Sequence, residues 1–228
     1  MKKKWVIVID GPSGAGKSTI SRLLAKKLGY LYLDTGALYR CVGLEADRKK
    51  IKSTDSRKLY QLVKRCKFSF KTKNLTQRVF LNGKDVTREI RKPKVSLLAS
   101  QYASLSIVRR ALLYVQRRFG KIGGIVAEGR DLGSVVFPKA ELKFFMVATL
   151  KERAKRRYLE LKPKFKGLRL VDVEREVRMR DLADSRRELA PLKRVKDAIS
   201  LDTTSLTIDQ VVEEMYKFFK KKHENSSQ

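Results

Sequence analysis

One stretch decides the fold: Trp5-Val6-Ile7-Val8-Ile9-Asp10-Gly11-Pro12-Ser13-Gly14-Ala15-Gly16-Lys17-Ser18-Thr19. Its first five residues form a continuous apolar run, as in a parallel strand that is covered on both faces. The next segment fits the pattern GxxxxGK[ST], and apolar residues then recur at helical spacing until Leu28, before Gly29. The stretch therefore predicts a buried strand, a phosphate-binding loop and an amphipathic helix.

A loop of this kind binds phosphate through its backbone. The glycines let successive N–H groups point at phosphate oxygens, with the helix N-terminus behind them. Lys17 can reach the β- and γ-phosphates, and the Ser18 hydroxyl can complete the coordination of Mg²⁺. We therefore expect a nucleoside triphosphate to be bound by Gly11, Pro12, Ser13, Gly14, Ala15, Gly16, Lys17, Ser18 and Thr19.

Short apolar runs that alternate with helical stretches extend this unit into an α/β fold. Four further strands are predicted at Tyr30–Leu33, Gly124–Ala127, Leu142–Val147 and Ala198–Leu201. Such runs indicate a five-stranded parallel sheet core flanked by helices. Thr207 is expected to cap a closing helix, whose apolar stripe comprises Ile208, Val211, Val212, Met215 and Phe219.

Two segments depart from the alternation. Residues 67–91 alternate apolar and polar side chains and contain the tight-turn pair Asn82-Gly83, which indicates a small antiparallel β insert. Residues 151–196 are helical and strongly basic, and the stretch Lys162–Gly167 is expected to divide them into two helices.

Composition excludes several classes of protein. The 54 Lys and Arg residues against 24 Asp and Glu give a net charge of +30, which indicates anionic partners. The single histidine, His223, lies in the polar tail and excludes Ser-His-Asp and multi-histidine metal sites. The two cysteines form no CxxC pair, and no apolar run approaches the roughly 18 residues of a membrane span. We expect a soluble, cytoplasmic protein without a membrane partner.

Polar side chains follow two of the predicted strands. Thr35 and Arg40 come after the second strand, and Glu128, Arg130 and Asp131 come after the third. Because ligands gather at the carboxyl ends of strands in an open α/β sheet, we expect these groups beside the phosphate-binding loop. Arg130 can clamp a phosphate, Asp131 can accept from an exocyclic amino group, and Glu128 can act on Mg²⁺ through water.

A third group lies in the basic region. Arg180, Asp184 and Arg187 are spaced i, i+4 and i+7, which predicts one helical face. Converging arginines suit phosphoryl transfer, which depends on positioning and charge stabilisation. On residues alone, a solvated ion-paired helix here and a helix-capping turn at Asp34–Arg40 remain alternative interpretations.

Taken together, the motifs resemble the bacterial-type cytidylate kinase family of nucleoside monophosphate kinases. The resemblance runs from the phosphate-binding loop through Asp34–Arg40, Leu81–Thr87, Ala99–Gln101, Val108-Arg109, Glu128–Asp131, Arg180–Arg187 and Asp197–Thr203. It implies one P-loop kinase domain with a core of residues 1–62, 104–150 and 197–224, a monophosphate-binding insert of about 63–103 and a helical lid of about 151–196. It further implies transfer of a phosphoryl group from MgATP to CMP or dCMP, by a monomer.

The resemblance also implies roles for individual residues. Ser100, Arg109 and Asp131 would recognise cytosine, whose N4-amino group distinguishes it from uracil. The acceptor's phosphate and sugar would be bound by Thr35, Arg40, Gly129, Arg130, Arg180, Asp184 and Arg187. Lys17, Arg130, Arg180 and Arg187 would be catalytic, Arg157 would help bind ATP, and Mg²⁺ would be held by Ser18 and, through water, by Glu128. The acceptor phosphate is already anionic, so no general base is implied.

Two departures from the family's pattern stand out. Ser106 replaces a proline that usually precedes the Val108-Arg109 pair, which predicts a looser approach of Arg109. The excess of lysine and arginine is not explained by the resemblance. Two alternatives therefore stay open: a P-loop kinase for UMP, AMP or a small metabolite, and a basic RNA-binding protein whose P-loop is secondary. Specific nucleic-acid binding is not expected, although weak non-specific association with RNA is compatible with the charge.

Overall fold

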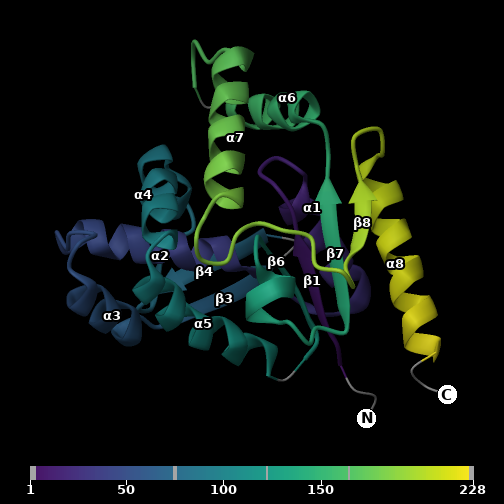
Figure 1. Ribbon diagram of the computed structural model, residues 1–228, viewed down its shortest axis with the longest axis horizontal. Coiled ribbons are helices and arrows are strands. Elements are labelled where there is room, and N and C mark those ends of the chain that lie inside the picture. The colour runs from purple at the N-terminus through teal and green to yellow at the C-terminus, as the bar shows by residue number, and fades with distance from the viewer. Residues whose placement is uncertain (1–3, 74–75, 122, 164, 226–228) are drawn as a thin grey trace.

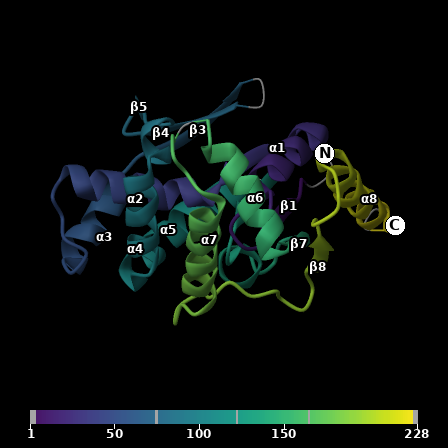
Figure 2. The ribbon, with the colours of Figure 1, turned by 90° about the horizontal axis from the view of Figure 1, so that it is seen from above.

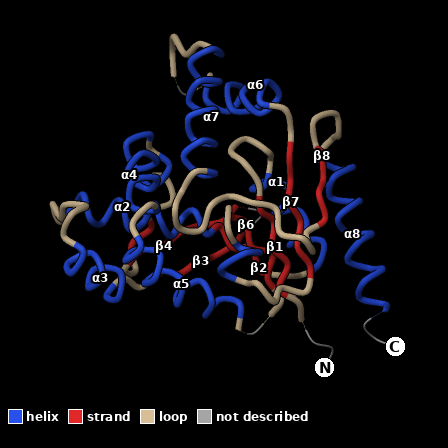
Figure 3. Tube along the Cα trace, viewed as in Figure 1, coloured by secondary structure: helices blue, strands red, loops and turns tan. Residues whose placement is uncertain are grey.

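The chain forms a helix-flanked parallel sheet with a smaller antiparallel sheet beside it. The computed structural model describes residues 4–73, 76–121, 123–163 and 165–225. The five parallel strands lie in the order β2-β6-β1-β7-β8. They are β1 (Val6–Asp10), β2 (Leu31–Asp34), β6 (Ile125–Gly129), β7 (Leu142–Val147) and β8 (Ile199–Asp202). The predicted five-stranded sheet is confirmed, with strand ends displaced by at most two residues (Figures 1 and 3).

Helices cover both faces of this sheet, which is why its strands are continuously apolar. On one face, α1 (Lys17–Leu28) and α8 (Ile208–Asn225) pack Leu24 and Met215 against Ile7 and Phe144. On the other face, α5 (Ser106–Gly120) and the π-helix η2 (Leu132–Val136) lie over β1, β2 and β6. The two layers leave the carboxyl ends of the strands open for a site.

The ends of α1 and α8 follow from local chemistry. Gly29 ends α1 in the left-handed conformation at φ 64°. Thr207 caps α8 as predicted, since its Oγ1 accepts the Gln210 N–H at 3.2 Å. The prediction of an apolar stripe on α8 is wrong at Ile208, whose exposed fraction is 51%. Ile208 is the first residue of the helix, and the buried residues of α8 begin one turn later, at Val211.

The insert is an antiparallel hairpin followed by helices. Strands β3 (Phe68–Lys73), β4 (Thr76–Leu81) and β5 (Lys84–Asp85) form it, then the 3₁₀ helix η1 (Glu89–Arg91) and α4 (Pro93–Ala103). The predicted turn is present, with Asn82 and Gly83 at φ 52° and 81°. The β4 residue Gln77 joins the insert to the main sheet, donating from Nε2 to the Tyr32 carbonyl at 2.6 Å.

The remaining helices extend the chain in two directions. Helices α2 (Thr35–Arg48) and α3 (Ser56–Arg65) lie with the insert, at the end of the molecule opposite α8. Helices α6 (Leu150–Leu161) and α7 (Leu170–Ser185) lie between these ends, beyond the carboxyl ends of the strands (Figure 2). The predicted break between α6 and α7 is confirmed, although Lys164 within it lies outside the described residues. Among the described helices, none has both the length and the apolar character that a bilayer crossing requires.

Candidate active site

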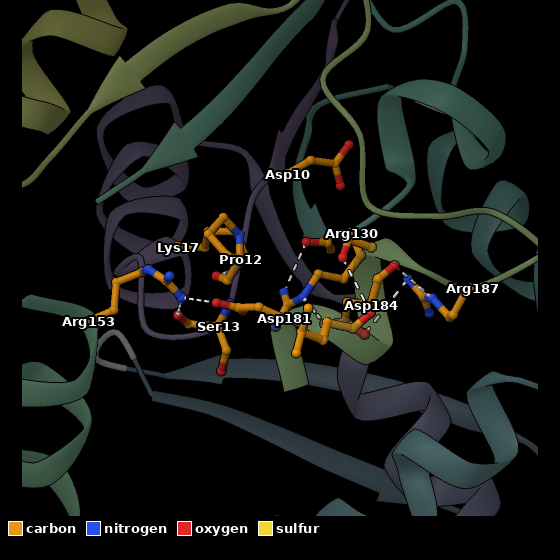
Figure 4. A network of polar contacts seen from close by, with 12 residues as sticks. Asp10, Pro12, Ser13, Lys17, Arg130, Arg153, Asp181, Asp184 and Arg187 are labelled. Atoms are coloured by element: carbon orange, nitrogen blue, oxygen red, sulfur yellow. Dashed lines mark hydrogen bonds and ion pairs between the residues drawn. The ribbon is translucent and has the colours of Figure 1, made fainter. Parts of the chain in front are cut away.

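The predicted site residues meet because three neighbouring strands end at one edge. In the sheet, Asp10 of β1 is level with Gly129 of β6, and Glu128 of β6 is level with Asp34 of β2. The glycine-rich loop, the start of α2 and the loop after β6 therefore emerge side by side. Helix α7 approaches the same edge from the lid (Figure 4).

The glycine-rich loop is closely packed against the sheet. A Cβ at Gly11 would lie 2.2 Å from the carbonyl oxygen of Met146, so only glycine fits there. Lys17 is 4% exposed, and its Nζ donates to the Pro12 carbonyl at 2.6 Å. Burial, with the nearby Arg130 guanidinium, lowers the pKa of Lys17 to about 7. An anion bound at this loop would offset both effects, because it favours the ammonium form of Lys17.

One carboxylate at the start of α2 holds two arginines. Asp34 Oδ2 accepts from Arg40 at 2.7 Å and from Arg91 of η1 at 2.8 Å, while Oδ1 caps α2 through the Ala37 N–H. Burial opposes the charge of Asp34, but the two guanidinium groups lower its pKa to about 2. Arg40 Nε is buried without a hydrogen-bond partner among the described residues. The Nε–H group of Arg40 is therefore available to donate a hydrogen bond to an anion.

The loop after β6 carries a second pair of charges. Asp131 forms an ion pair with Arg109 of α5, and both side chains are buried. Arg109 also donates to the Ala103 carbonyl at 3.2 Å, so the serine at position 106 leaves it firmly placed. A Cβ at Gly129 would lie 2.7 Å from Leu132 and 2.9 Å from Thr35 Oγ1, which fixes this turn as glycine. The pair can read a base edge with one donor and one acceptor group.

The lid meets this loop through Arg130. Its Nε donates to Asp184 Oδ2 at 2.8 Å, and the negative charge of Asp184 raises the pKa of Arg130 against the effect of burial. Arg187 contacts the same aspartate, with 3.8 Å between Nη2 and Oδ1. The prediction of one helical face is wrong for Arg187, because α7 ends at Ser185 and Arg187 lies in the following segment. The three residues still converge, since the chain folds back after the helix.

A lid carboxylate also touches the glycine-rich loop. Asp181 of α7 accepts the Ser13 N–H at 3.1 Å and forms an ion pair with Arg153 of α6. Arg153 donates in turn to the Ser13 carbonyl at 2.9 Å (Figure 4). Arg180 lies nearby, where burial and Arg130 lower its pKa to about 10. Helices α6 and α7 thus contact the glycine-rich loop directly.

Glu128 is the carboxylate predicted to act on Mg²⁺ through water. It is buried, accepts from the Tyr32 hydroxyl, and its charge acts on Lys17. The Thr35 hydroxyl donates to the Glu128 carbonyl at 2.7 Å, and the Ser18 side chain is exposed at the start of α1. Across the described ranges, no three histidine, cysteine or acidic residues are grouped to hold a metal ion. One hydroxyl and one carboxylate fit an Mg²⁺ ion whose other ligands are phosphates and water.

Two predicted residues form none of the hydrogen bonds and ion pairs described above, although the charge of Arg157 acts on Arg180. Ser100 is exposed on α4, and Arg157 of α6 pairs with Glu160 at 2.8 Å. Their nucleotide-binding roles stay predictions.

Several residues of the polar network around the site were not predicted from the sequence. These are Asp10, Tyr32, Arg91, Arg153 and Asp181. Each acts through a contact at least 28 positions away in the chain. Asp10 carried one usable signal, a carboxylate at the end of an apolar strand, directly before the glycine-rich loop.

A parallel sheet in the order β2-β6-β1-β7-β8, with the glycine-rich loop between β1 and α1, defines the class of P-loop kinases. A solved gluconokinase from Sinorhizobium meliloti 1021 has this fold, with a TM-score of 0.50, 15% identity and coverage of 100% of this chain and 98% of that one. The sequence model named Cytidylate kinase matches residues 7–221. The chain belongs to the cytidylate kinase family.

Curated relatives agree over nearly the whole length. The cytidylate kinase of Syntrophotalea carbinolica is 50% identical over 94% of this chain and 92% of its own. That of Caldicellulosiruptor saccharolyticus is 47% identical over 96% of this chain and 97% of its own. These matches do not favour the alternatives of another acceptor or of an RNA-binding protein.

Proposed function

We propose that the protein transfers the terminal phosphoryl group of MgATP to CMP or dCMP, giving ADP and CDP or dCDP. One observation supports this above the others: Lys17, the Arg130–Asp184 pair and the Arg109–Asp131 pair surround one edge of the sheet. A donor phosphate at the glycine-rich loop and an acceptor beside Arg130 would then be close enough to react.

The acceptor's base is assigned to the Arg109–Asp131 pair. Asp131 offers a carboxylate to the N4-amino group of cytosine, while Arg109 donates to O2 and N3, with Ser100 as a third contact. Uracil presents a carbonyl where cytosine has the amino group, and a carbonyl facing Asp131 leaves that carboxylate unpaired. Such a site rejects the wrong base strongly, because buried polar groups then lose their partners.

The acceptor's phosphate is assigned to the arginine cluster. Among the described residues, Arg40 Nε and Arg187 Nη2 are buried and form no hydrogen bond, although Arg187 Nη2 lies 3.8 Å from Asp184 Oδ1. Arg130 and Arg180 lie near Lys17, since burial and the positive charges of both lower the pKa of Lys17. Thr35 and Gly129, which lie against each other, are assigned to the acceptor site, and Asp184 is assigned to the acceptor's sugar.

The reaction then needs positioning and charge stabilisation. An anionic oxygen of the CMP phosphate attacks the γ-phosphorus of ATP in line, the bond to the bridging oxygen breaks, and ADP leaves. Lys17, Arg130, Arg180 and Arg187 stabilise the charge that spreads over the transferred group. The Ser18 hydroxyl and, through water, Glu128 would hold Mg²⁺, which would supply further positive charge beside the phosphates. No proton has to be removed from the acceptor.

The lid and the insert would cover the reacting groups. Residues 151–196 would close over ATP, with Arg157 as an added contact, and residues 63–103 would close over CMP. Closure excludes water and suppresses hydrolysis of ATP. All groups assigned here come from one chain, so a monomer, with the domain limits given above, is sufficient for activity.

An acceptor panel tests the proposal. Initial rates of ADP formation are measured with CMP, dCMP, UMP and AMP at saturating MgATP, with an acceptor-free reaction as the control. We expect CMP and dCMP to exceed UMP by at least about 100-fold in kcat/KM, as a pocket built on hydrogen bonds requires. A preference for UMP or AMP, or no turnover with any acceptor, would contradict the proposal.

A further inference from the structure

Asp10 is a buried carboxylate that none of the assigned steps uses. It is the last residue of β1, is 5% exposed, and stands immediately before the glycine-rich loop. In Figure 4 its side chain points away from Lys17 and towards the loop that carries Arg130. A charged group this deeply buried needs hydrogen bonds to offset the loss of water.

Both oxygens of Asp10 are used on the loop after β6. Oδ1 accepts the Leu132 N–H at 3.0 Å, and Oδ2 accepts the Gly133 N–H at 2.8 Å. These are two successive backbone donors at the start of η2, where N–H groups have no helical partner. Asp10 is therefore an anionic cap for η2 that comes from another strand, 122 and 123 positions away in the chain.

The capped segment directly follows the acceptor-binding residues. Arg130 and Asp131 are the two residues before Leu132, and Asp131 has φ −140° and ψ 23°. The Asp131 carbonyl accepts the Val135 N–H at 2.9 Å, so the same short segment is held from both sides. With the amides of Leu132 and Gly133 fixed, the backbone at Asp131 cannot rotate without breaking a hydrogen bond to a charged group.

We propose that Asp10 is a positioning residue for base recognition: its carboxylate fixes the loop of Arg130 and Asp131 against the strand that carries the glycine-rich loop. It touches neither substrate, and it acts through Asp131 and its partner Arg109. The proposal rests on the proposed function, since it gives Asp131 the reading of cytosine. It assigns part of the specificity to a residue of the donor-binding strand.

The test is Asp10→Asn, which keeps the side chain's shape and one acceptor oxygen but directs an NH₂ group at a backbone N–H. Losing one charge-assisted hydrogen bond on the loop should raise KM for CMP about tenfold and narrow the CMP-over-UMP ratio of kcat/KM by a similar factor. KM for ATP should stay within about twofold, because the amides of the glycine-rich loop are untouched. The matched control is Asp55→Asn, which removes the exposed N-cap carboxylate of α3 and should change none of these values.

A double-mutant cycle separates this role from a general loss of stability. If Asp10 acts through Asp131, then Asp10→Asn combined with Asp131→Ala should narrow the CMP-over-UMP ratio no further than Asp131→Ala alone. Additive losses in the ratio, an unchanged ratio in Asp10→Asn, or a rise confined to KM for ATP would overturn the proposal. Far-UV circular dichroism and the melting temperature establish folding, and Asp10→Glu, which displaces the carboxylate by one methylene, replaces Asp10→Asn if that variant does not fold.

The wild-type reaction distinguishes the two levels of failure. If wild-type enzyme shows no preference for CMP, then the proposed function fails first. If wild-type prefers CMP strongly and Asp10→Asn retains that preference, then only the role of Asp10 fails.

Discussion

The donor side and the acceptor side of the site are built differently. The glycine-rich loop is one continuous segment, closed on itself by the contact from Lys17 to the Pro12 carbonyl. The acceptor side is assembled from β2, α2, η1, α5, β6 and α7, and four of its arginines, Arg40, Arg91, Arg109 and Arg130, form ion pairs with aspartates. The donor side relies on backbone groups, whereas the acceptor side relies on side chains whose positions depend on distant partners.

The carboxylates of the acceptor side have a second effect. Burial, together with the positive charge of Arg130, lowers the pKa of Arg180 to about 10, so the clustered guanidinium groups repel one another. Asp34, Asp131 and Asp184 offset that repulsion and keep the cluster together. The acceptor's phosphate has to displace these carboxylates from the arginines or bind beside them. The donor's phosphate instead meets backbone N–H groups of the glycine-rich loop.

Lys17→Ala should have the largest effect. Because Lys17 is the one lysine within the loop, its loss should lower kcat on the order of 1,000-fold while the protein still folds. Single-turnover rates and circular dichroism measure the two properties. The neighbouring helix residue Lys26→Ala, which is exposed, serves as the control. Near-normal turnover in Lys17→Ala would mean that the loop does not bind the transferred phosphate.

Arg130→Met should come next. This change removes the cation between Lys17 and Asp184 and leaves the Asp184 carboxylate without its closest partner. We expect kcat with CMP to fall about 100-fold, since one preorganised charge contact of the transition state is lost. Steady-state kinetics with Arg118→Met, an exposed arginine of α5, provide the comparison. Equal effects of both changes would remove Arg130 from the catalytic set.

Asp131→Ala should act on selectivity more than on rate. The CMP-over-UMP ratio of kcat/KM should narrow by at least about tenfold, because the acceptor for the N4-amino group is gone. KM for ATP should change little, since the contacts of Asp131 lie on the acceptor side. Competition between CMP and UMP in one reaction gives the ratio directly, and an unchanged ratio would place base recognition elsewhere.

The smallest effect concerns protons on the donor side. Lys17 has its pKa lowered to about 7, mainly by burial. A bound triphosphate favours the ammonium form of Lys17. At pH 8 most Lys17 side chains of the free enzyme are neutral, because the pKa lies about one unit lower. Binding of MgATP should therefore take up about 0.9 proton per site. The affinity for MgATP should be highest below pH 7, and it should fall by at most about tenfold per pH unit as the pH rises above 7. Calorimetry in buffers of different ionisation enthalpy measures the uptake, and Lys17→Arg should abolish it.

The same difference between the two sides explains what the sequence could reveal. The strand, the loop and α1 follow from a local pattern, so one stretch of sequence predicted the strand to within one residue and the start of the helix at Lys17. On the acceptor side the sequence indicated Arg40, Arg130 and Asp131, because they directly follow apolar strands at the carboxyl edge of the sheet.

Their partners could not be found in this way. Arg91 is joined to Asp34 across 57 positions, and nothing in its neighbourhood distinguishes it from the other basic residues of so cationic a chain. Arg187 was misplaced for a different reason. Its spacing fits a helical face, but where α7 ends is decided by tertiary packing and not by periodicity.

The contact of Lys17 with the Pro12 carbonyl has a consequence for successive rounds of turnover. When ADP leaves, the ammonium of Lys17 can return to the Pro12 carbonyl. The buried charge then keeps a hydrogen-bond partner, and the loop keeps its conformation. The loop then already has the conformation that binds the next triphosphate, so the free energy of binding is not reduced by the cost of rearranging the loop.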